Sequence, residues 1–266
     1  MIFFASLRSL WAYRYFILGS VKREFQARYQ GTQLGVFWVV AHPLSLILVY
    51  TLVFAGLMKS AMPGHTSRFA YGIYLCSGIL TWTFFIEMLS RCVNIFVENA
   101  NLLKKVQFPK LCLPIIVTAS SALHFCIILS LFLIFLGLID SFPGAIIFAV
   151  LPVLAIQIAL TLGLGILLAT INVFFRDVGQ SVAVIVQFWF WLTPIVYAPT
   201  VLPPFAARIL AWNPMWPLIN AYHDIFLEQH LPAWHSLLYP ALLALVLVLL
   251  AMRAFSRLQA EIVDEL

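Results

Sequence analysis

Charged residues are scarce in this chain: Asp, Glu, Lys and Arg together make up only 9% of its 266 residues. Soluble domains carry about 25% charged residues, because a folded globule needs a hydrated surface. The scarcity therefore excludes an ordinary soluble domain. Apolar residues instead make up 64% of the sequence, and the mean hydropathy is +1.03. Most of the outer surface must face hydrocarbon, and apolar runs of helical span length predict an all-α integral membrane protein.

Motifs for chemistry are also missing. No phosphate-binding loop of the form G-x-x-x-x-G-K-[ST] occurs, so any ATP-driven work needs a separate nucleotide-binding chain. The six histidines lack metal-ligand spacing, and the four cysteines lie in or beside apolar segments, where they are interpreted as small hydrophobic residues. No Ser/His/Asp order suggests a nucleophile. We therefore expect no catalytic residue, metal site or cofactor on this chain.

The hydropathy pattern predicts six transmembrane helices, since a hydrocarbon core of about 30 Å needs roughly 20 apolar residues per helix. Their approximate limits are residues 34–57, 69–97, 111–139, 144–175, 180–197 and 236–255. The beginning of the sequence has no short apolar core followed by a small-residue cleavage site, so a removable signal peptide is not expected. Residues 34–266 are thus assigned to one transmembrane domain.

Basic residues indicate how the chain is oriented. Six spans place both termini on one side, and a cytoplasmic assignment puts eleven of the fifteen Lys and Arg residues in the cytoplasm: Arg8, Arg14, Lys22, Arg23, Arg28, Lys104, Lys105, Lys110, Arg176, Arg253 and Arg257. The other side receives only Lys59, Arg68 and Arg208. By the positive-inside rule, both termini are expected in the cytoplasm. Because these charges flank apolar spans, they do not suggest nucleic-acid binding.

Three segments outside the spans have distinct patterns. Residues 1–33 mix basic, aromatic and aliphatic positions, which is typical of a helix lying in the membrane interface. Residues 198–233 hold six prolines yet remain apolar, which predicts short, broken, re-entrant helices shielded by protein. Residues 99–108 are read as a compact helix. They form either a turn whose lysines obey the positive-inside rule, or a helix that docks into a cytoplasmic partner.

Two charge pairs are candidates for structural roles. Glu87 and Arg91 lie four residues apart in the second span, the favourable order for a helical ion pair. Charges at bilayer depth are costly, so this pair is expected to neutralise itself or, alternatively, to line a polar path. Arg176 and Asp177, at the inner end of the fourth span, are interpreted as an anchor instead of a catalytic pair.

The fifth predicted span contains four consecutive aromatic residues, Phe188 to Trp191. They cover every face of a helix, so at least one points inward. Aromatic faces stack on the apolar C–H faces of sugar rings, and such weak contacts suit a sliding sugar polymer. Helix packing is the alternative explanation for these side chains.

Four stretches of this sequence resemble ABC-2-type export permeases. They are residues 22–38 (KREFQARYQGTQLGVFW) with Pro43, residues 101–109 (NLLKKVQFP) with Leu113–Pro114, residues 172–178 (NVFFRDV), and residues 194–197 (PIVY) with Asn213–Pro214 and Pro217–Leu218. The resemblance runs nearly end to end and is closest to the polysaccharide-exporting branch, which contains Wzm-type O-antigen, capsule and teichoic-acid permeases.

The resemblance implies a homodimeric pore above two copies of a separate ABC ATPase that binds ATP and Mg. It places this chain in the bacterial inner membrane and implies export of a lipid-linked polysaccharide, most simply O-antigen. It makes residues 99–108 the coupling helix, with these ATPase-contacting residues: Asn101, Leu102, Lys104, Lys105, Phe108 and Pro109. It also makes the first and fifth spans line the pore, which favours Trp38, Tyr50, Trp189, Trp191 and Tyr197 as aromatic lining.

Three other functions fit parts of the pattern. The same fold could export a small drug or lipid, which a narrower channel would reveal. An ATP-independent channel or proton-coupled carrier would be expected to show inverted repeats and midplane carboxylates, but no internal repeat is found and only Glu87 qualifies. A membrane glycosyltransferase would need several carboxylates at the membrane face, which Asp177 alone does not supply.

Overall fold

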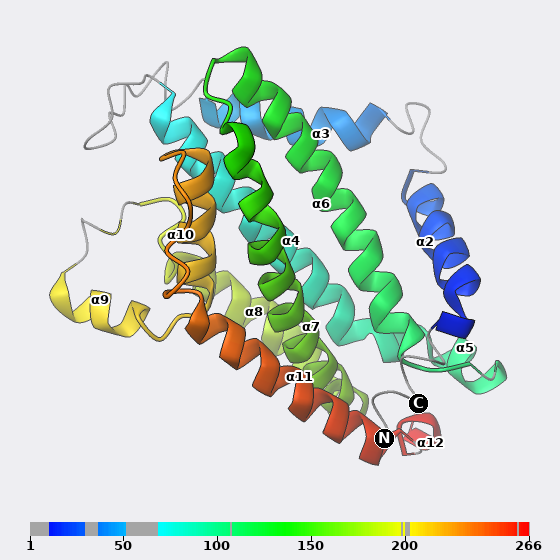
Figure 1. The fold of residues 1–266 in the computed structure, drawn as a ribbon. Coiled ribbons are helices and arrows are strands. Elements are labelled where there is room, and N and C mark those ends of the chain that lie inside the picture. The colour runs from blue at the N-terminus through cyan, green and yellow to red at the C-terminus, as the bar shows by residue number, and fades with distance from the viewer. Residues whose placement is uncertain are drawn as a thin grey trace.

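The computed structural model describes residues 11–29, 37–51, 69–106, 108–197, 199, 203–259 and 261–265. These residues are helical, with no strand among them, so the predicted all-α class is confirmed for this part of the chain (Figure 1). The elements are α2 (Arg14–Tyr29), α3 (Phe37–Thr51), α4 (Ala70–Glu98), α5 (Ala100–Lys105), α6 (Cys112–Leu138), the 3-10 helix η2 (Gly144–Ala149), α7 (Val150–Phe174), α8 (Asp177–Trp191), α9 (Pro204–Leu210), α10 (Met215–Phe226), α11 (Leu238–Leu258) and α12 (Glu261–Glu265).

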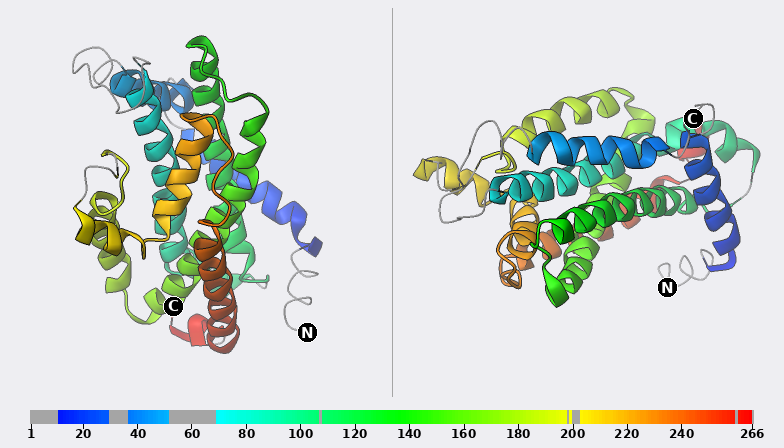
Figure 2. Two further views of the ribbon diagram at one scale, coloured as in Figure 1. Left: turned by 60° about the vertical axis from the view of Figure 1, so that its left-hand side comes forward. Right: turned by 90° about the horizontal axis from the view of Figure 1, so that it is seen from above.

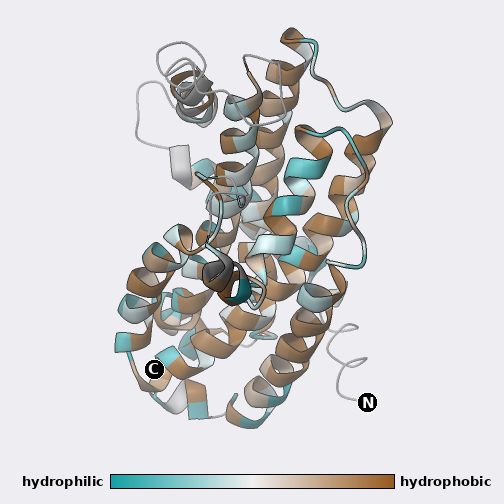
Figure 3. Cartoon of the chain, turned by 90° about the vertical axis from the view of Figure 1, so that its left-hand side faces the viewer, coloured by the Kyte–Doolittle hydropathy of each residue, from teal (hydrophilic) through white to brown (hydrophobic). Residues whose placement is uncertain are grey.

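Four helical segments in the described residues are long and apolar enough to cross a membrane: Ala70–Glu98, Cys112–Leu138, Gly144–Phe174 and Leu238–Leu258. They correspond to the predicted second, third, fourth and sixth spans, and hydrophobic residues cover them (Figure 3). The predicted first span overlaps α3, whose flanking residues 30–36 and 52–68 lie outside the described part. The predicted fifth span corresponds to α8, which has 15 residues. At 1.5 Å per residue, 15 residues rise about 22 Å, less than the hydrocarbon thickness of about 30 Å.

Helix α8 does not coincide with residues 180–197, the predicted fifth span. Helix α8 begins at Asp177, whose carboxylate lies in the first turn, where the helix dipole favours negative charge. It ends at Trp191, three residues before Pro194. Proline has no N–H to continue a helix and disfavours helical geometry at the residue before it, which explains the early end.

Helix α4 forms the centre of the bundle. It packs against α3, α6, α7, α8 and α10, and 78% of its most apolar 18-residue window is buried inside the protein, against 22–33% in the other three candidate spans. It also has the lowest mean hydropathy of the four, 1.5 against 2.2–2.5. A helix surrounded by protein does not need a uniformly apolar surface, so α4 can carry polar side chains that the outer helices, which face lipid, cannot.

Helix α7 is packed tightly between α11 and α4, and glycines make the close approach possible. A Cβ atom built at Gly163 would lie 2.8 Å from the backbone nitrogen of Val248 in α11. A Cβ atom built at Gly165 would lie 2.6 Å from Cys92 Cβ in α4. Small residues at such contacts let helix backbones pack closely within a membrane, where association depends on van der Waals contact.

Two short helices, α9 and α10, occupy the proline-rich segment 198–233, of which residues 198, 200, 201 and 202 lie outside the described part. Helix α10 is largely buried against α4 and α7. Its Tyr222 hydroxyl donates to Gln157 Oε1 of α7 (3.0 Å), and Gln157 Nε2 donates to the Thr81 carbonyl of α4 (2.9 Å). These two hydrogen bonds link α10, α7 and α4. They satisfy polar groups that would have no partner in hydrocarbon.

Several helix ends meet at one end of the bundle. Helix α5 lies there beside α12, at the end where α4, α7 and α11 finish and α6 and α8 begin (Figures 1 and 2). Helix α2 packs along the adjoining part of α6. Helices α9 and α10 lie away from this end (Figure 2). The α5 end and the α9/α10 region therefore offer two separate surfaces for function.

Candidate functional site

Helix α5 presents basic side chains from a fixed position. It follows α4 directly, and Asn99, which joins the two helices, donates from Nδ2 to the Ile95 carbonyl (2.9 Å). Leu103 is buried, at 7% exposure, and Leu102 packs partly against the core. Lys104 and Lys105 are exposed, as is Asn101. The apolar residues of α5 therefore anchor the helix while its polar residues project outward.

The residues after α5 form a hollow next to it. Phe108 is half-buried and packs against Phe16 of α2, with ring centroids 5.4 Å apart. Lys110 Nζ donates to the Gln259 carbonyl just beyond α11. The hollow has a volume of about 460 Å³ and is lined by Tyr13, Leu103, Val106, Phe108, Pro109 and Lys110. Phe108 thus links α5 to α2, a contact that the sequence alone did not predict.

Charged side chains of both signs are exposed at this end, and the carboxylates are those of Glu98, Asp177, Glu261 and Glu265. The exposed cations on its helices are Lys104, Lys105, Arg176, Arg253 and Arg257. Arg208 of α9 lies away from it. Such a mixed surface can contact a partner through groups of either sign, and on α5 itself the exposed charges are the two lysines.

Glu87 and Arg91 do not neutralise each other as predicted. The ion pairs among the described residues join Arg91 Nη2 to Glu24 Oε2 of α2 at 2.5 Å, and Glu87 Oε2 to His124 Nδ1 of α6 at 2.6 Å. Glu24 also accepts from Ser120 Oγ (2.6 Å), and Arg91 Nη1 donates to Ser121 Oγ (3.3 Å). The shared face of Glu87 and Arg91 meets α6 and α2, so partners on those helices replace the intrahelical pair.

Arg176 and Asp177 are both exposed, and no ion pair joins them among the residues that the structure describes. The anchor between α7 and α8 is Asn172 instead. Its Oδ1 accepts from the Gly179 backbone N–H (2.9 Å), and its Nδ2 donates to the Val93 carbonyl (3.0 Å). The predicted role of the charged pair is therefore carried by a buried amide two residues before α7 ends.

Of the predicted pore aromatics, Trp189 is fixed by the fold. Its ring packs edge-on against Phe85 of α4, with centroids 5.3 Å apart. Its Nε1 donates to Asn213 Oδ1 (2.9 Å), which also accepts from the Met215 backbone N–H (3.0 Å). Asn213 Nδ2 donates to Thr193 Oγ1 (2.9 Å). Asn213 therefore fastens α8, the following turn and α10 together.

Trp191 and Tyr197 border an aromatic groove between α8 and α9. Trp191 is 63% exposed, and its carbonyl accepts from the Tyr197 hydroxyl (2.9 Å). The groove has a volume of about 550 Å³, and its aromatic lining is Trp189, Trp191, Tyr197, Phe205 and Trp212. The structure thus brings three of the five predicted aromatics to one place. The side chains of the other two, Trp38 and Tyr50, lie outside the described residues.

Phe205 and Trp212 were missed by the reasoning from sequence. Both are strongly exposed, at 68% and 78%. The sequence carries no signal that separates them from Tyr222 and Phe226, aromatics of the same proline-rich segment that are fully buried. The aromatic groove can bind flat apolar surfaces by stacking. Among the described residues no group of His, Cys, Asp or Glu could hold a metal ion.

Replacing Asn213 with Ala is expected to lower the free energy of unfolding by about 2 kcal/mol, because Trp189 Nε1 and the Met215 N–H lose their acceptor. SDS titration in mixed micelles measures the change, and the fluorescence of the tryptophans should shift with it. Gln180→Ala, at an exposed position of α8, is the matched control and should stay within about 0.5 kcal/mol. Equal stability of the two variants would contradict the anchoring role of Asn213.

Comparison with known proteins gives consistent results. The family described as ABC-2 type transporter matches residues 16–227. An "O-antigen export system permease protein RfbA" from Myxococcus xanthus is 31% identical over 262 residues, covering 98% of each chain. Two proteins of the same name from Klebsiella pneumoniae are 28% and 26% identical over 239 residues, covering 89% of each chain.

Proposed function

The chain belongs to the ABC-2 type transporter family, and we propose that it is the transmembrane permease of an ATP-driven exporter of lipid-linked polysaccharide, namely the O-antigen of lipopolysaccharide. The observation that carries this proposal is the similarity to an O-antigen export permease over 98% of both chains. ATP and Mg are assigned to a separate ATPase, because the sequence has no phosphate-binding loop. The permease itself makes no covalent change.

In this proposal the protein crosses the bacterial inner membrane six times, with α3 and the shorter α8 completing the crossings and both termini in the cytoplasm. The cations on the α5 end support this orientation by the positive-inside rule. Local thinning of the bilayer accommodates crossings shorter than the hydrocarbon core at modest cost. Segment 198–233 then lies at the outer side as re-entrant helices.

Two copies form the pore. Helix α8 supports the pairing of two copies, because one of its faces exposes large apolar side chains that a second copy could cover: Val184, Ile185, Phe188, Trp191 and Leu192. The aromatic groove lies along the same helix and gives a sugar chain stacking surfaces without strong hydrogen bonds. Weak, repeated contacts let a polymer advance in steps, whereas tight binding would hold it in place.

The ATPase docks on α5. Closure of its nucleotide-bound dimer pushes on this helix, and the buried Leu103 and half-buried Leu102 pass the push to the bundle. The contact of Phe108 with Phe16 carries the same movement to α2, the helix at the membrane interface. Asn101, Lys104, Lys105 and Pro109 complete the docking surface.

The proposal is tested by deleting this chain in its host and following the polymer. Lipid-linked polysaccharide should accumulate at the cytoplasmic side of the inner membrane, while O-antigen disappears from the cell surface. Affinity purification of the tagged chain in mild detergent should recover an ATPase with a phosphate-binding loop. Normal surface O-antigen in the deletion strain, or a purified chain without an ATPase, would overturn the proposal.

A further inference from the structure

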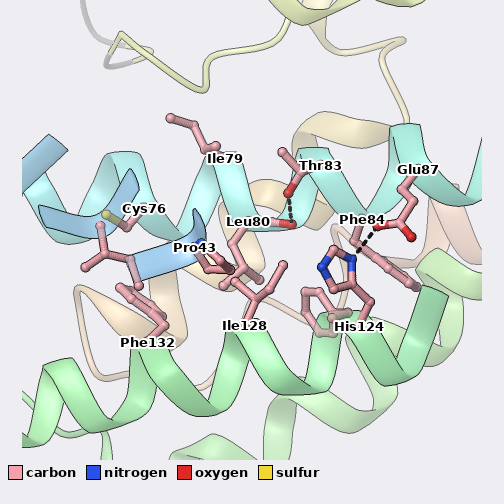
Figure 4. A pocket seen from close by; sticks show the side chains of 12 residues that line it. Pro43, Cys76, Ile79, Leu80, Thr83, Phe84, Glu87, His124, Ile128 and Phe132 are labelled. Carbon is pink, nitrogen blue, oxygen red and sulfur yellow. Dashed lines mark hydrogen bonds and ion pairs between the residues drawn. The ribbon is translucent and has the colours of Figure 1, made fainter. Parts of the chain in front are cut away.

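A second site lies within the bundle, on the side away from the aromatic groove. The inference rests on the proposed membrane orientation but not on transport of a polysaccharide. A cavity of about 130 Å³ separates α3, α4 and α6 (Figure 4). Its walls are mainly apolar and include Ile47, Leu80, Phe84, Ile128 and Phe132. A cavity of about 150 Å³ lined by such residues holds one benzene molecule, so this one has room for about six carbon atoms.

One end of this cavity is polar. His124 and Glu87 face each other there, with Nδ1 and Oε2 2.6 Å apart, and the opposite edge of the imidazole faces Leu80 and Ile128 (Figure 4). Both side chains keep 22% of their surface exposed. Thr83 also lines the cavity, and its hydroxyl donates to the Leu80 carbonyl (3.0 Å).

His124 also borders a second cavity, so the two cavities share this side chain as a wall. The second cavity has a volume of about 370 Å³ and lies between α2, α4 and α6, lined by Glu24, Phe25, Ala27, Arg91, Ser120, Leu123 and His124. It lies beside α2, the helix assigned to the membrane interface, whereas the apolar cavity continues along α4 into the bundle. The imidazole of His124 thus stands between a polar cavity beside α2 and an apolar cavity beside α3.

The polar cavity presents charges of both signs. The side chains of Arg91 and Glu24 remain 27% and 36% exposed although they form an ion pair. A guanidinium has five N–H donors, and Arg91 uses Nη2 on Glu24 and Nη1 on Ser121. The hydrogen bonds that Glu24 accepts from described residues go to Oε2, which leaves Oε1 facing no described donor. The pair can therefore contact an anion and a cation at once.

We propose that these two cavities bind one phospholipid of the inner leaflet with a phosphate–ammonium headgroup, namely a phosphatidylethanolamine. Its phosphate contacts Arg91, its primary ammonium donates to Glu24, its glycerol ester region passes His124, and the first part of one acyl chain fills the cavity beside Leu80 and Ile128.

Charge complementarity selects this headgroup over the alternatives. An anionic headgroup is attracted by Arg91 but repelled by Glu24, and the pair has no net charge to favour it. A quaternary ammonium cannot donate a hydrogen bond to a carboxylate, while a primary ammonium has three donors. The bound lipid would brace α2 against α4 and α6, the helices that the Glu24–Arg91 pair already joins.

The test exchanges lipids on the purified full-length protein. The protein is delipidated, incubated with equal amounts of phosphatidylethanolamine, phosphatidylcholine and phosphatidylglycerol, and retained lipid is counted by mass spectrometry. We expect about one phosphatidylethanolamine per chain, retained about tenfold over the other two, because a charge-assisted hydrogen bond contributes roughly 1.5–3 kcal/mol. Glu24→Gln should reduce this preference to within about twofold.

Cavity-filling variants locate the site. Ile128→Trp should reduce retention by about tenfold, since the indole takes the space of the acyl chain. Thr83→Phe fills the same cavity from α4 and replaces the first variant if that one fails to fold. Ile134→Trp, on the exposed surface of α6, is the control and should retain the lipid. Unchanged retention in the folded cavity-filling variants, or preference for phosphatidylglycerol over phosphatidylethanolamine, would overturn the proposal.

Discussion

Replacing Gly163 with Leu is expected to prevent accumulation of folded protein in the membrane. A Cβ atom at this position would lie 2.8 Å from the Val248 nitrogen and 2.9 Å from the Leu247 carbonyl carbon, and both are backbone atoms of α11. Because backbone cannot rotate away as a side chain can, α7 and α11 must separate along their whole contact. Overpacking that side chains absorb costs about 1–3 kcal/mol, and separating two backbones costs more. A marginally stable bundle cannot absorb such a loss.

Gly137→Leu is the matched control. Gly137 lies in the last turn of α6, which is also long and apolar enough to cross a membrane, but nothing lies within 4 Å of a Cβ atom built there. This variant should accumulate as the parent protein does, since leucine is a better helix former than glycine by roughly 0.8 kcal/mol. Fluorescence-detected size-exclusion chromatography of detergent extracts measures both variants. A monodisperse peak for Gly163→Leu would show that the α7–α11 contact is looser than the structure indicates.

The same contact illustrates what the sequence could and could not predict. Long apolar runs predicted the four helices that are long and apolar enough to cross a membrane, to within a few residues. A run of about 20 apolar residues can be recognised from neighbouring positions of the chain alone. Whether a glycine touches another helix depends instead on how distant parts of the chain pack together. Gly137 and Gly163 look alike in sequence, and only the position of α11 separates them.

The charged residues of α4 give a second example. The spacing of Glu87 and Arg91 indicated a pair, and the costs of membrane burial correctly required each to have a partner. The partners, however, lie 37 and 67 residues away, on α6 and α2. A helix surrounded by others has several candidates for each charge, and a single sequence offers no means of choosing among them.

The aromatic residues of α8 are a third example of what the sequence could and could not predict. At least one ring of Phe188 to Trp191 was expected to point inward, and two do. Trp189 packs against Phe85 and donates to Asn213, and Phe190 packs against Trp82. Trp191, two residues after Trp189, remains exposed in the groove. The early end of α8 at Trp191 could have been predicted from Pro194, whereas the hydrogen bonds that hold the following turn depend on Asn213.

Reversing the charges of Lys104 and Lys105 together is expected to abolish ATP-driven export while leaving the permease folded. Both side chains are exposed on α5, so glutamates there disturb no packing in this chain. The change places two negative charges where a partner complementary to lysine carries acidic groups. Like charges facing each other across an interface cost several kcal/mol, which corresponds to at least about a hundredfold loss of affinity.

The measurement is export and ATP hydrolysis in vesicles that contain the permease and its ATPase, together with recovery of the ATPase on the tagged permease. Lys104→Arg with Lys105→Arg keeps the charge and should preserve both activities. Arg208→Glu changes the net charge in the same direction on α9, away from α5, and should also leave ATPase recovery unchanged. If the double glutamate variant still recovers the ATPase and exports polymer, α5 is not the docking helix. If Arg208→Glu loses the ATPase as well, the effect comes from net charge and not from the position of α5.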